Sequence, residues 1–482
     1  MKLKEKVKKF HELPIQLKCT VSYIVASLLT NGLSFFTTPL FTRIMTPADM
    51  GDVTAFNSWQ SILAAIVTLS LSSGSFSVAM VEYKDNRDQY ISSILTLSSI
   101  STILFFLIYL TYKSELNELF NLGTDLMILM FIGFLFTPAM NYWLLRERFE
   151  YKYKSVLVVT LLSASLSTLI SIAVVLFAKT VDYKRLGIAR LYGSYIPTYI
   201  LSGVLFLVIF LKGKTFFNKI YWKFSLSLSL PLIVHTLSKY ILDMSDRIMI
   251  DHFIGKAELG IYGVLYTVSS LSIIFWSAIN SSLIPITFEK LENKNFIDLE
   301  RLLKPIIVLF AVGCTLLSLF SPEIVKIIAT EEYYSAIYLM PPISAGIFFT
   351  SIYTIYGNVL TFYKKTKAIM ISTLLSAGVN VFLNYLFIPK YGAIAASYTT
   401  LIAYILLTIF QMVAVIRITG VTIIEKKFLG TIIVFTIVWA LLCNILYQII
   451  YLRIITITII GVICLFNQKN IKNIFTKILV KR

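Results

Sequence analysis

Long apolar segments dominate the chain and limit its fold more than any other feature. About 20 apolar residues cross the hydrocarbon core of a bilayer as a helix. Lipid offers a peptide group no hydrogen-bond partner, so each such segment must satisfy its own backbone as a helix. Only 14% of the residues are charged, against about 25% in typical soluble domains. The sequence therefore predicts an all-α, polytopic membrane protein of about fourteen transmembrane helices. The segments lie near residues 19–42, 53–80, 91–112, 122–145, 155–178, 188–211, 224–250, 259–287, 303–321, 336–361, 368–388, 393–416, 428–446 and 449–466, and Arg453 interrupts the last two.

The distribution of Lys and Arg residues predicts the orientation of these helices. Both ends of the chain are basic, and fourteen spans place both ends on the same side. That side receives 31 of the 43 basic residues, the other side receives nine, and three lie within spans. By the positive-inside rule both termini are cytoplasmic. The net charge of +18 then follows from topology and contact with membrane lipids, and no nucleic-acid partner is expected.

The loops leave no room for soluble catalytic chemistry. The longest, 289–304, has about sixteen residues of mixed charge. The chain contains no GxxxxGK[ST], GxSxG or HExxH motif. The cysteines lie in or at apolar segments without a CxxC pair, so we expect no disulfide, no metal site and no cofactor. We expect no enzyme and no catalytic residue. The four cysteines are Cys19, Cys314, Cys443 and Cys464.

An internal repeat organises the chain. "TRIMTPADMGDVTAF" (42–56) follows the first apolar segment, and "DRIMIDHFIGKAELGIYGV" (246–264) follows the seventh. Both contain "RIM", and "ADMG" corresponds to "AELG". Two more pairs keep the same order, "TLLSAS" with "TLLSAG" and "GIARLYGSYIPTYIL" with "GAIAASYTTLIAYIL", at offsets of 204 to 213 residues. An even number of spans per half makes the halves parallel, with substrate bound between them.

The repeat predicts five regions. A basic cytoplasmic N-terminus (1–18) precedes an N-lobe of six helices (19–212). A cytoplasmic linker (213–223) leads to a C-lobe of six helices (224–417). Helices 13 and 14 and a basic cytoplasmic tail (418–482) lie outside the repeat.

The repeat motifs also carry a resemblance to a known family. The end of the first span, "FFTTPLFTRIMTPADMGDVTAFNSW", is similar to the start of polysaccharide-export flippases. These are O-antigen and capsule repeat-unit translocases of the multidrug/oligosaccharidyl-lipid/polysaccharide exporter superfamily. The segments 246–269 and 362–404 resemble the same family, and the resemblance covers about residues 19–417. It implies the V-shaped, two-lobed fold of MATE-like transporters.

The resemblance also implies a substrate and a mechanism. The substrate would be an oligosaccharide on undecaprenyl diphosphate, moved from the cytoplasmic to the outer leaflet of a bacterial inner membrane by alternating access. A polysaccharide polymerase and glycosyltransferases of the same pathway are the implied partners. Related flippases have a cationic cavity lined by helices 1, 2, 7 and 8. Arg43 and Arg247 match the arginines of the two repeat motifs.

The seventh span contains the main candidate site. In "HTLSKYILDMSDRIMID" (235–251) five ionisable residues fall within about 120° of one helix face. Each unpaired charge at the bilayer centre costs about 2.5–3.5 kcal/mol, so the face must meet a wet cavity or partners within the protein. Two interpretations stay open. Lys239–Asp243 and Asp243–Arg247 could form a structural ladder of ion pairs. Alternatively, Lys239 and Arg247 bind a diphosphate while His235, Asp243 and Asp246 tune the charge or couple an ion.

Other polar residues in spans carry weaker predictions. Arg190 either lines the cavity as a further cation or extends to the outer surface. Five amide side chains are predicted to join helices by hydrogen bonds or, alternatively, to contact sugar. They are Asn31, Gln60, Asn280, Asn380 and Asn384.

Two rival functions remain. An ion-coupled multidrug or cation exporter of the same superfamily is one, although the first span has no carboxylate of the kind that some such exporters use. A membrane-embedded polysaccharide polymerase is the other, although no sizeable external loop is present. The sugar, the coupling ion and the oligomeric state are not encoded in any motif of the sequence.

Overall fold

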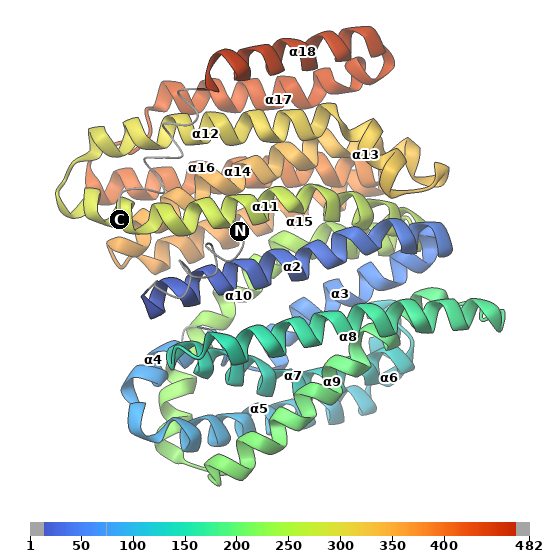
Figure 1. The fold of residues 1–482 in the computed structure, drawn as a ribbon, viewed down its shortest axis with the longest axis vertical. Helices are drawn as coiled ribbons and strands as arrows, with labels where there is room; N and C mark the ends of the chain where they lie inside the picture. Colours follow the sequence, from blue (N-terminus) through green and yellow to red (C-terminus); the bar gives the residue numbers. More distant parts are fainter. Residues whose placement is uncertain (1–13, 74, 469–482) are drawn as a thin grey trace, which may run out of the picture. The chain divides into compact units, whose positions relative to one another are not determined.

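The computed structural model describes residues 14–73 and 75–468, and every regular element in this part of the chain is a helix (Figure 1). Most of the predicted basic N-terminus and the basic C-terminal tail lie outside the described residues. Twelve of the described helices are long and apolar enough to cross a membrane. The prediction of an all-α, multi-pass membrane protein is confirmed, whereas the count of fourteen spans is not.

Two predicted segments account for the difference in count. The second, 53–80, is divided between α3 (Pro47–Val67) and α4 (Ser75–Glu82). Leu69 and Ser70 separate them with positive φ angles of 55° and 46°, a backbone that a helix does not contain. The fourteenth, α18 (Ile450–Phe466), has 17 residues and is shorter than the other apolar helices.

The described residues group into two compact units. The first comprises the chain up to Met45 and Asp52–Leu237, and the second comprises Thr46–Gly51 and the chain from Ser238 onward. The boundary therefore falls inside one long helix, α10 (Lys219–Phe253).

The first unit contains α3 from Asp52 onward, α4 and the first half of α10, together with six other helices. Buried aromatic residues form part of its core, where Phe76 stacks on Tyr142 with ring centroids 4.9 Å apart. Two buried hydroxyl pairs, Ser75 with Ser229 and Tyr90 with Ser225, each at 2.6 Å, bind the first half of α10 to this core. The other helices are α2 (Ile15–Ile44), α5 (Arg87–Thr111), α6 (Lys113–Phe120), α7 (Thr124–Phe149), α8 (Tyr153–Thr180) and α9 (Leu186–Gly213), with a short 3₁₀ helix η1 (Lys84–Asn86).

An ion-pair network closes the C-terminal end of α7. Arg146 lies 3.1 Å from Asp88 and 3.2 Å from Glu150, and Lys152 lies 2.5 Å from Glu150. Burial alone would raise the pKa of Glu150. The hydrogen bond from Lys152 and the charges of Arg146 and Lys152 outweigh that effect and lower it.

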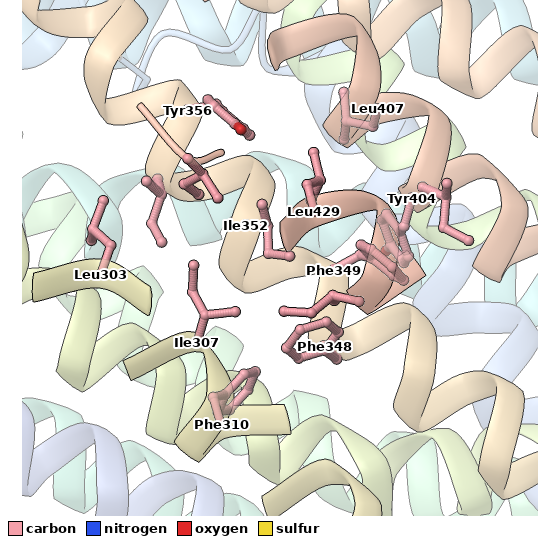
Figure 2. Close-up of a cluster of buried hydrophobic side chains, with 14 of the residues drawn as sticks. Leu303, Ile307, Phe310, Phe348, Phe349, Ile352, Tyr356, Tyr404, Leu407 and Leu429 are labelled. Atoms are coloured by element: carbon pink, nitrogen blue, oxygen red, sulfur yellow. The ribbon is translucent and has the colours of Figure 1, made fainter. Parts of the chain in front are cut away.

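The second unit is built around α14 (Met340–Phe362). In its most apolar stretch 83% of the residues are buried, against 28% in α17 (Lys426–Gln448). Figure 2 shows part of the core, in which Ile307 and Phe310 of α12 lie near Phe348 of α14, and Ile352 of α14 and Leu407 of α16 belong to the same cluster. The other elements are the second half of α10, α11 (Lys256–Glu292), α12 (Phe296–Leu319), α13 (Ser321–Ile328), a 3₁₀ helix η2 (Glu331–Leu339), α15 (Thr366–Tyr391), α16 (Ala393–Thr419), α17 and α18.

Arg453, which interrupts the last predicted spans, has a partner in the second unit. Its side chain is buried and forms an ion pair with Glu323 of α13. Nearby, the Tyr447 hydroxyl of α17 donates to the Ser318 carbonyl at 2.5 Å. The pair neutralises a charge that would otherwise be costly in an apolar helix.

Two glycines of the repeat motifs lie against backbone within the second unit. A Cβ on Gly51 would overlap the carbonyl oxygen of Lys256 and lie 2.7 Å from its carbonyl carbon. A Cβ on Gly260 would overlap the carbonyl oxygen of Pro47 and lie 2.7 Å from the nitrogen of Gly51. The first turns of α3 and α11 thus touch backbone to backbone, through the "ADMG" and "AELG" motifs.

Candidate functional site

The charged face of α10 lies among tyrosines in the second unit. Asp243 accepts a hydrogen bond from the Tyr404 hydroxyl of α16 at 2.8 Å. Asp246, only 1% exposed, accepts one from the Tyr262 hydroxyl of α11 and another from the Arg247 backbone N–H at 2.8 Å. Both carboxylates are therefore held by neutral donors. Such bonds satisfy buried charge without removing it.

The predicted ladder of ion pairs is absent from the described part of the chain. Neither Lys239–Asp243 nor Asp243–Arg247 comes within 4.0 Å, although both are spaced four residues apart on one face. Lys239 is exposed, whereas Asp243 and Arg247 are partly buried. The charges on this face are thus stabilised mainly by partners on other helices.

Arg247 rests on an aromatic ring. Its guanidinium carbon lies 4.2 Å from the centroid of the Tyr266 ring, and Nη1 contacts the sulfur of Met244. Its Nε is buried and has no hydrogen-bond partner among the described residues. A cation over an aromatic face gains about 0.5–2 kcal/mol and keeps its full charge. Arg247 therefore retains N–H groups able to bind an anion.

Four tyrosines complete this site, and we call them the tyrosine cluster: Tyr262, Tyr266, Tyr353 and Tyr404. Tyr262 and Tyr266 lie on α11 with ring centroids 6.0 Å apart. Tyr353 of α14 stacks on Tyr404, with centroids 5.9 Å apart and planes 21° apart. None of the four was among the site residues predicted from the sequence. The i, i+4 spacing of Tyr262 and Tyr266 directly after the charged segment was the signal that could have indicated two of the four.

The remaining predicted site residues occupy the first unit. Arg43 is exposed in the last turn of α2, and the guanidinium of Arg190 on α9 lies 3.9 Å from the centroid of the Phe41 ring. His235 is partly buried on the first half of α10. The four predicted cations are thus divided equally between the units, and Arg190 and Arg247 share the same support by an aromatic face.

The amide side chains act mainly as bonds between helices. Gln60 donates to Tyr199 at 3.1 Å, and Asn358 donates to Asn280 at 2.8 Å. The fully buried Asn380 accepts from Ser245 of α10 at 2.7 Å. The fully buried Asn384 accepts from the Thr399 hydroxyl of α16. Four of the five predicted amides thus join helices, and Asn31 bonds within its own helix.

Two cavities lie away from the charged face of α10. In the first unit a cavity of about 450 Å³ borders α7 and α9, and in the second a cavity of about 670 Å³ borders α11, α12 and α13. None of the predicted site residues lines either one, and their walls are mostly apolar. Within the described residues no group of three or more His, Cys, Asp or Glu side chains could hold a metal ion.

A match to a family model identifies the family of this chain. The family model described as "Polysaccharide biosynthesis protein" matches residues 17–291, more than half of the chain. The chain belongs to this family. The MatE model also matches residues 231–386. The family match thus confirms the resemblance of the repeat motifs to membrane proteins of polysaccharide biosynthesis.

Solved structures show the same fold. The lipid II flippase MurJ in an inward closed conformation matches with a TM-score of 0.67 at 16% identity, over 93% of this chain and 99% of MurJ. An inward-facing multidrug resistance MATE transporter matches with a TM-score of 0.61 at 13% identity, over 84% of this chain and 100% of the transporter. At these identities the similarity shows the fold alone.

Curated relatives match over less than half of their length. A probable low-salt glycan biosynthesis flippase, Agl15 of Haloferax volcanii, is 21% identical over 42% of this chain and 42% of its own. An uncharacterized membrane protein of Methanocaldococcus jannaschii is 24% identical over 46% of this chain and 48% of its own. One relative of this chain is thus described as a glycan flippase.

Proposed function

We propose that the chain is a flippase that moves an oligosaccharide linked to undecaprenyl diphosphate from the cytoplasmic to the outer leaflet of a bacterial inner membrane, by alternating access. Both termini are cytoplasmic in this proposal, and the six-helix lobes are 19–212 and 224–417. The chain has no catalytic role, and it works beside the glycosyltransferases and the polymerase of its pathway. Family membership and the description of Agl15 support the substrate class.

The observation that carries the proposal is the state of Arg247. An arginine within a span costs about 2.5–3.5 kcal/mol, and the Tyr266 ring returns only about 0.5–2 kcal/mol of it. No carboxylate lies within 4.0 Å of its guanidinium in the described residues, and its Nε has no partner. A partly buried cation with unfilled donors suits an anion such as a diphosphate, which arginine binds through paired N–H groups.

Deletion of the gene tests the proposal. Lipid-linked repeat units should accumulate unpolymerised on the cytoplasmic face, where an impermeant lectin reaches them only after the membrane is opened. Complementation with the wild-type gene should restore surface polysaccharide, and complementation with Arg247→Ala should not, at equal protein abundance. Arg417→Ala is the matched control, because Arg417 is exposed at the end of α16 and should be replaceable. Full export by Arg247→Ala would contradict the role of this residue.

Export of cationic drugs is the second candidate. The MatE match covers the charged face of α10, and Asp243 and Asp246 are acidic groups that a cation could approach. A basic Arg247 opposes it, because like charges repel in a medium of low dielectric constant. A deletion strain with normal surface polysaccharide but heightened sensitivity to cationic dyes would favour the exporter over the flippase.

A further inference from the structure

Asp243 and Arg247 have the geometry of an ion pair, yet they do not form one. An acid four residues before a base on a helix places the two Cβ atoms about 5–6 Å apart, in the favoured order for pairing. In surroundings of low dielectric constant the attraction is stronger than in water. The two groups nevertheless stay more than 4.0 Å apart. Something in the second unit must hold the carboxylate away from the guanidinium.

The Tyr404 hydroxyl donates a hydrogen bond to the Asp243 carboxylate. It donates to Oδ1 at 2.8 Å, from a side chain that is itself buried. The Tyr404 ring is fixed on one side by stacking on Tyr353 and on another by α14, where a Cβ on Gly346 would lie 3.3 Å from ring atom Cδ2. The ring therefore has little freedom to follow Asp243 toward Arg247.

The Tyr262 hydroxyl does the same for the second carboxylate. It donates to Asp246, and the Tyr262 side chain is fully buried. Its neighbour on the same face of α11, Tyr266, carries the Arg247 guanidinium on its ring. The tyrosine cluster thus provides a hydroxyl partner for each carboxylate and an aromatic face for the base, and neither carboxylate comes within 4.0 Å of the guanidinium.

We propose that Tyr404 and Tyr262 are positioning residues that hold Asp243 and Asp246 off Arg247, so that its guanidinium stays open to a diphosphate-type anion. This inference rests on the proposed function and adds specificity residues to it. Without the tyrosine hydroxyl, Asp243 turns to Arg247 and competes with the ligand. If the new Asp243–Arg247 pair leaves the guanidinium unpaired in about a tenth of the molecules, the apparent affinity for the anion falls about tenfold.

A double-variant series tests the inference on the full chain in lipid nanodiscs. The probes are undecaprenyl diphosphate in the bilayer and inorganic diphosphate in solution, and binding is measured by native mass spectrometry and titration. Tyr404→Phe should weaken binding about tenfold, and Asp243→Asn should leave it close to wild type. The double variant Tyr404→Phe with Asp243→Asn should bind like Asp243→Asn alone. This rescue is the decisive result, because a merely structural role of Tyr404 would not be corrected by removing the acid.

Tyr356→Phe is the matched control. Tyr356 lies on α14 outside the tyrosine cluster, and its buried hydroxyl has no hydrogen-bond partner among the described residues, so this hydroxyl should be dispensable. Binding of both probes assigns recognition to the diphosphate alone, and binding of only the lipid assigns it to the headgroup with its chain; either agrees with the inference when the series holds. A double variant as weak as Tyr404→Phe, or a Tyr404→Phe equal to wild type, would overturn it.

A structure of Tyr404→Phe gives a second measurement that needs no ligand. The inference requires Asp243 to lie within 4.0 Å of Arg247 in that variant, and a separation unchanged from the wild type would refute it. If the wild-type chain binds neither probe, the proposed substrate class fails, while this distance still decides whether the tyrosine positions the acid.

Discussion

The backbone contact between α3 and α11 predicts that Gly260→Ala destabilises the protein. A Cβ at this position would overlap the Pro47 carbonyl oxygen and lie 2.9 Å from its carbonyl carbon, whereas carbon contacts are normal at about 3.5–4.0 Å. The obstructing atoms are backbone and cannot rotate away, so the two helix ends must separate.

The magnitude follows from two opposing effects. Overpacking of a tight contact costs about 1–3 kcal/mol. Alanine in a helix is favoured over glycine by about 0.5–1 kcal/mol, which offsets part of that cost. We therefore expect a net loss of up to about 2.5 kcal/mol in the free energy of unfolding. Gly378→Ala in α15 is the control, because a Cβ there meets nothing within 4 Å, and it should gain about 0.5–1 kcal/mol.

The assay is unfolding of the purified full chain from mixed micelles by increasing SDS, followed by tryptophan fluorescence. Wild type, Gly260→Ala and Gly378→Ala are compared at the same micelle composition. A Gly260→Ala chain as stable as Gly378→Ala would refute the reasoning, because it would mean that the two backbones are not in contact.

Four further predictions have simpler tests. Arg247→Lys should keep part of the export that Arg247→Ala loses, measured as surface polysaccharide, because a diphosphate needs charge first and the planar fork second. The pKa of Glu150 is lowered in the folded chain, so this group contributes stability above its unfolded pKa of about 4.3, and the contribution is lost as the pH falls through the folded pKa. Glu150→Gln should therefore make the free energy of unfolding depend less on pH in the acid range, measured in the same SDS assay at several pH values. Glu323→Ala should destabilise the chain in the SDS assay by about 1–3 kcal/mol, because it leaves Arg453 buried and unpaired although Glu323 itself is half exposed, and adding Arg453→Leu should recover most of the loss. A reporter that fluoresces only in the cytoplasm should be bright when fused to Arg482, and a dark, stable fusion would indicate an odd number of spans.

Hydrophobic length predicted most of the helices correctly. The predicted segments 91–112, 155–178 and 393–416 correspond to α5, α8 and α16. The reason is that lipid, not a tertiary partner, decides where such a helix must run. Hydrophobic length did not predict the break at Leu69 and Ser70, because the apolar residues on both sides were joined into one segment; the Ser- and Gly-rich sequence 70–75 was the local signal that could have marked it.

Of the candidate site, only the charged residues of α10 were predicted from the sequence, and the tyrosines on the other helices were not. The charged face of α10 follows from helical periodicity within a single segment. Its partners, Tyr262, Tyr266 and Tyr404, lie on α11 and α16, and no spacing rule connects α10 to α16 over more than 150 residues. The sequence therefore predicted ion pairs within α10, because helical spacing gives distances only between residues of the same helix.

The ion pair between Arg453 and Glu323 has a consequence for how the chain enters the membrane. The ribosome delivers α13 before α18, so the acid is already in place when the arginine arrives. A segment with Arg near its start is a poor insertion substrate alone, at a cost of about 2.5–3.5 kcal/mol if the charge reaches the bilayer centre. The Arg453 side chain of α18, the last helix of the described residues, thus meets a counter-ion synthesised 130 residues earlier. In the second unit, stable insertion of α18 therefore requires that α13 is already in place.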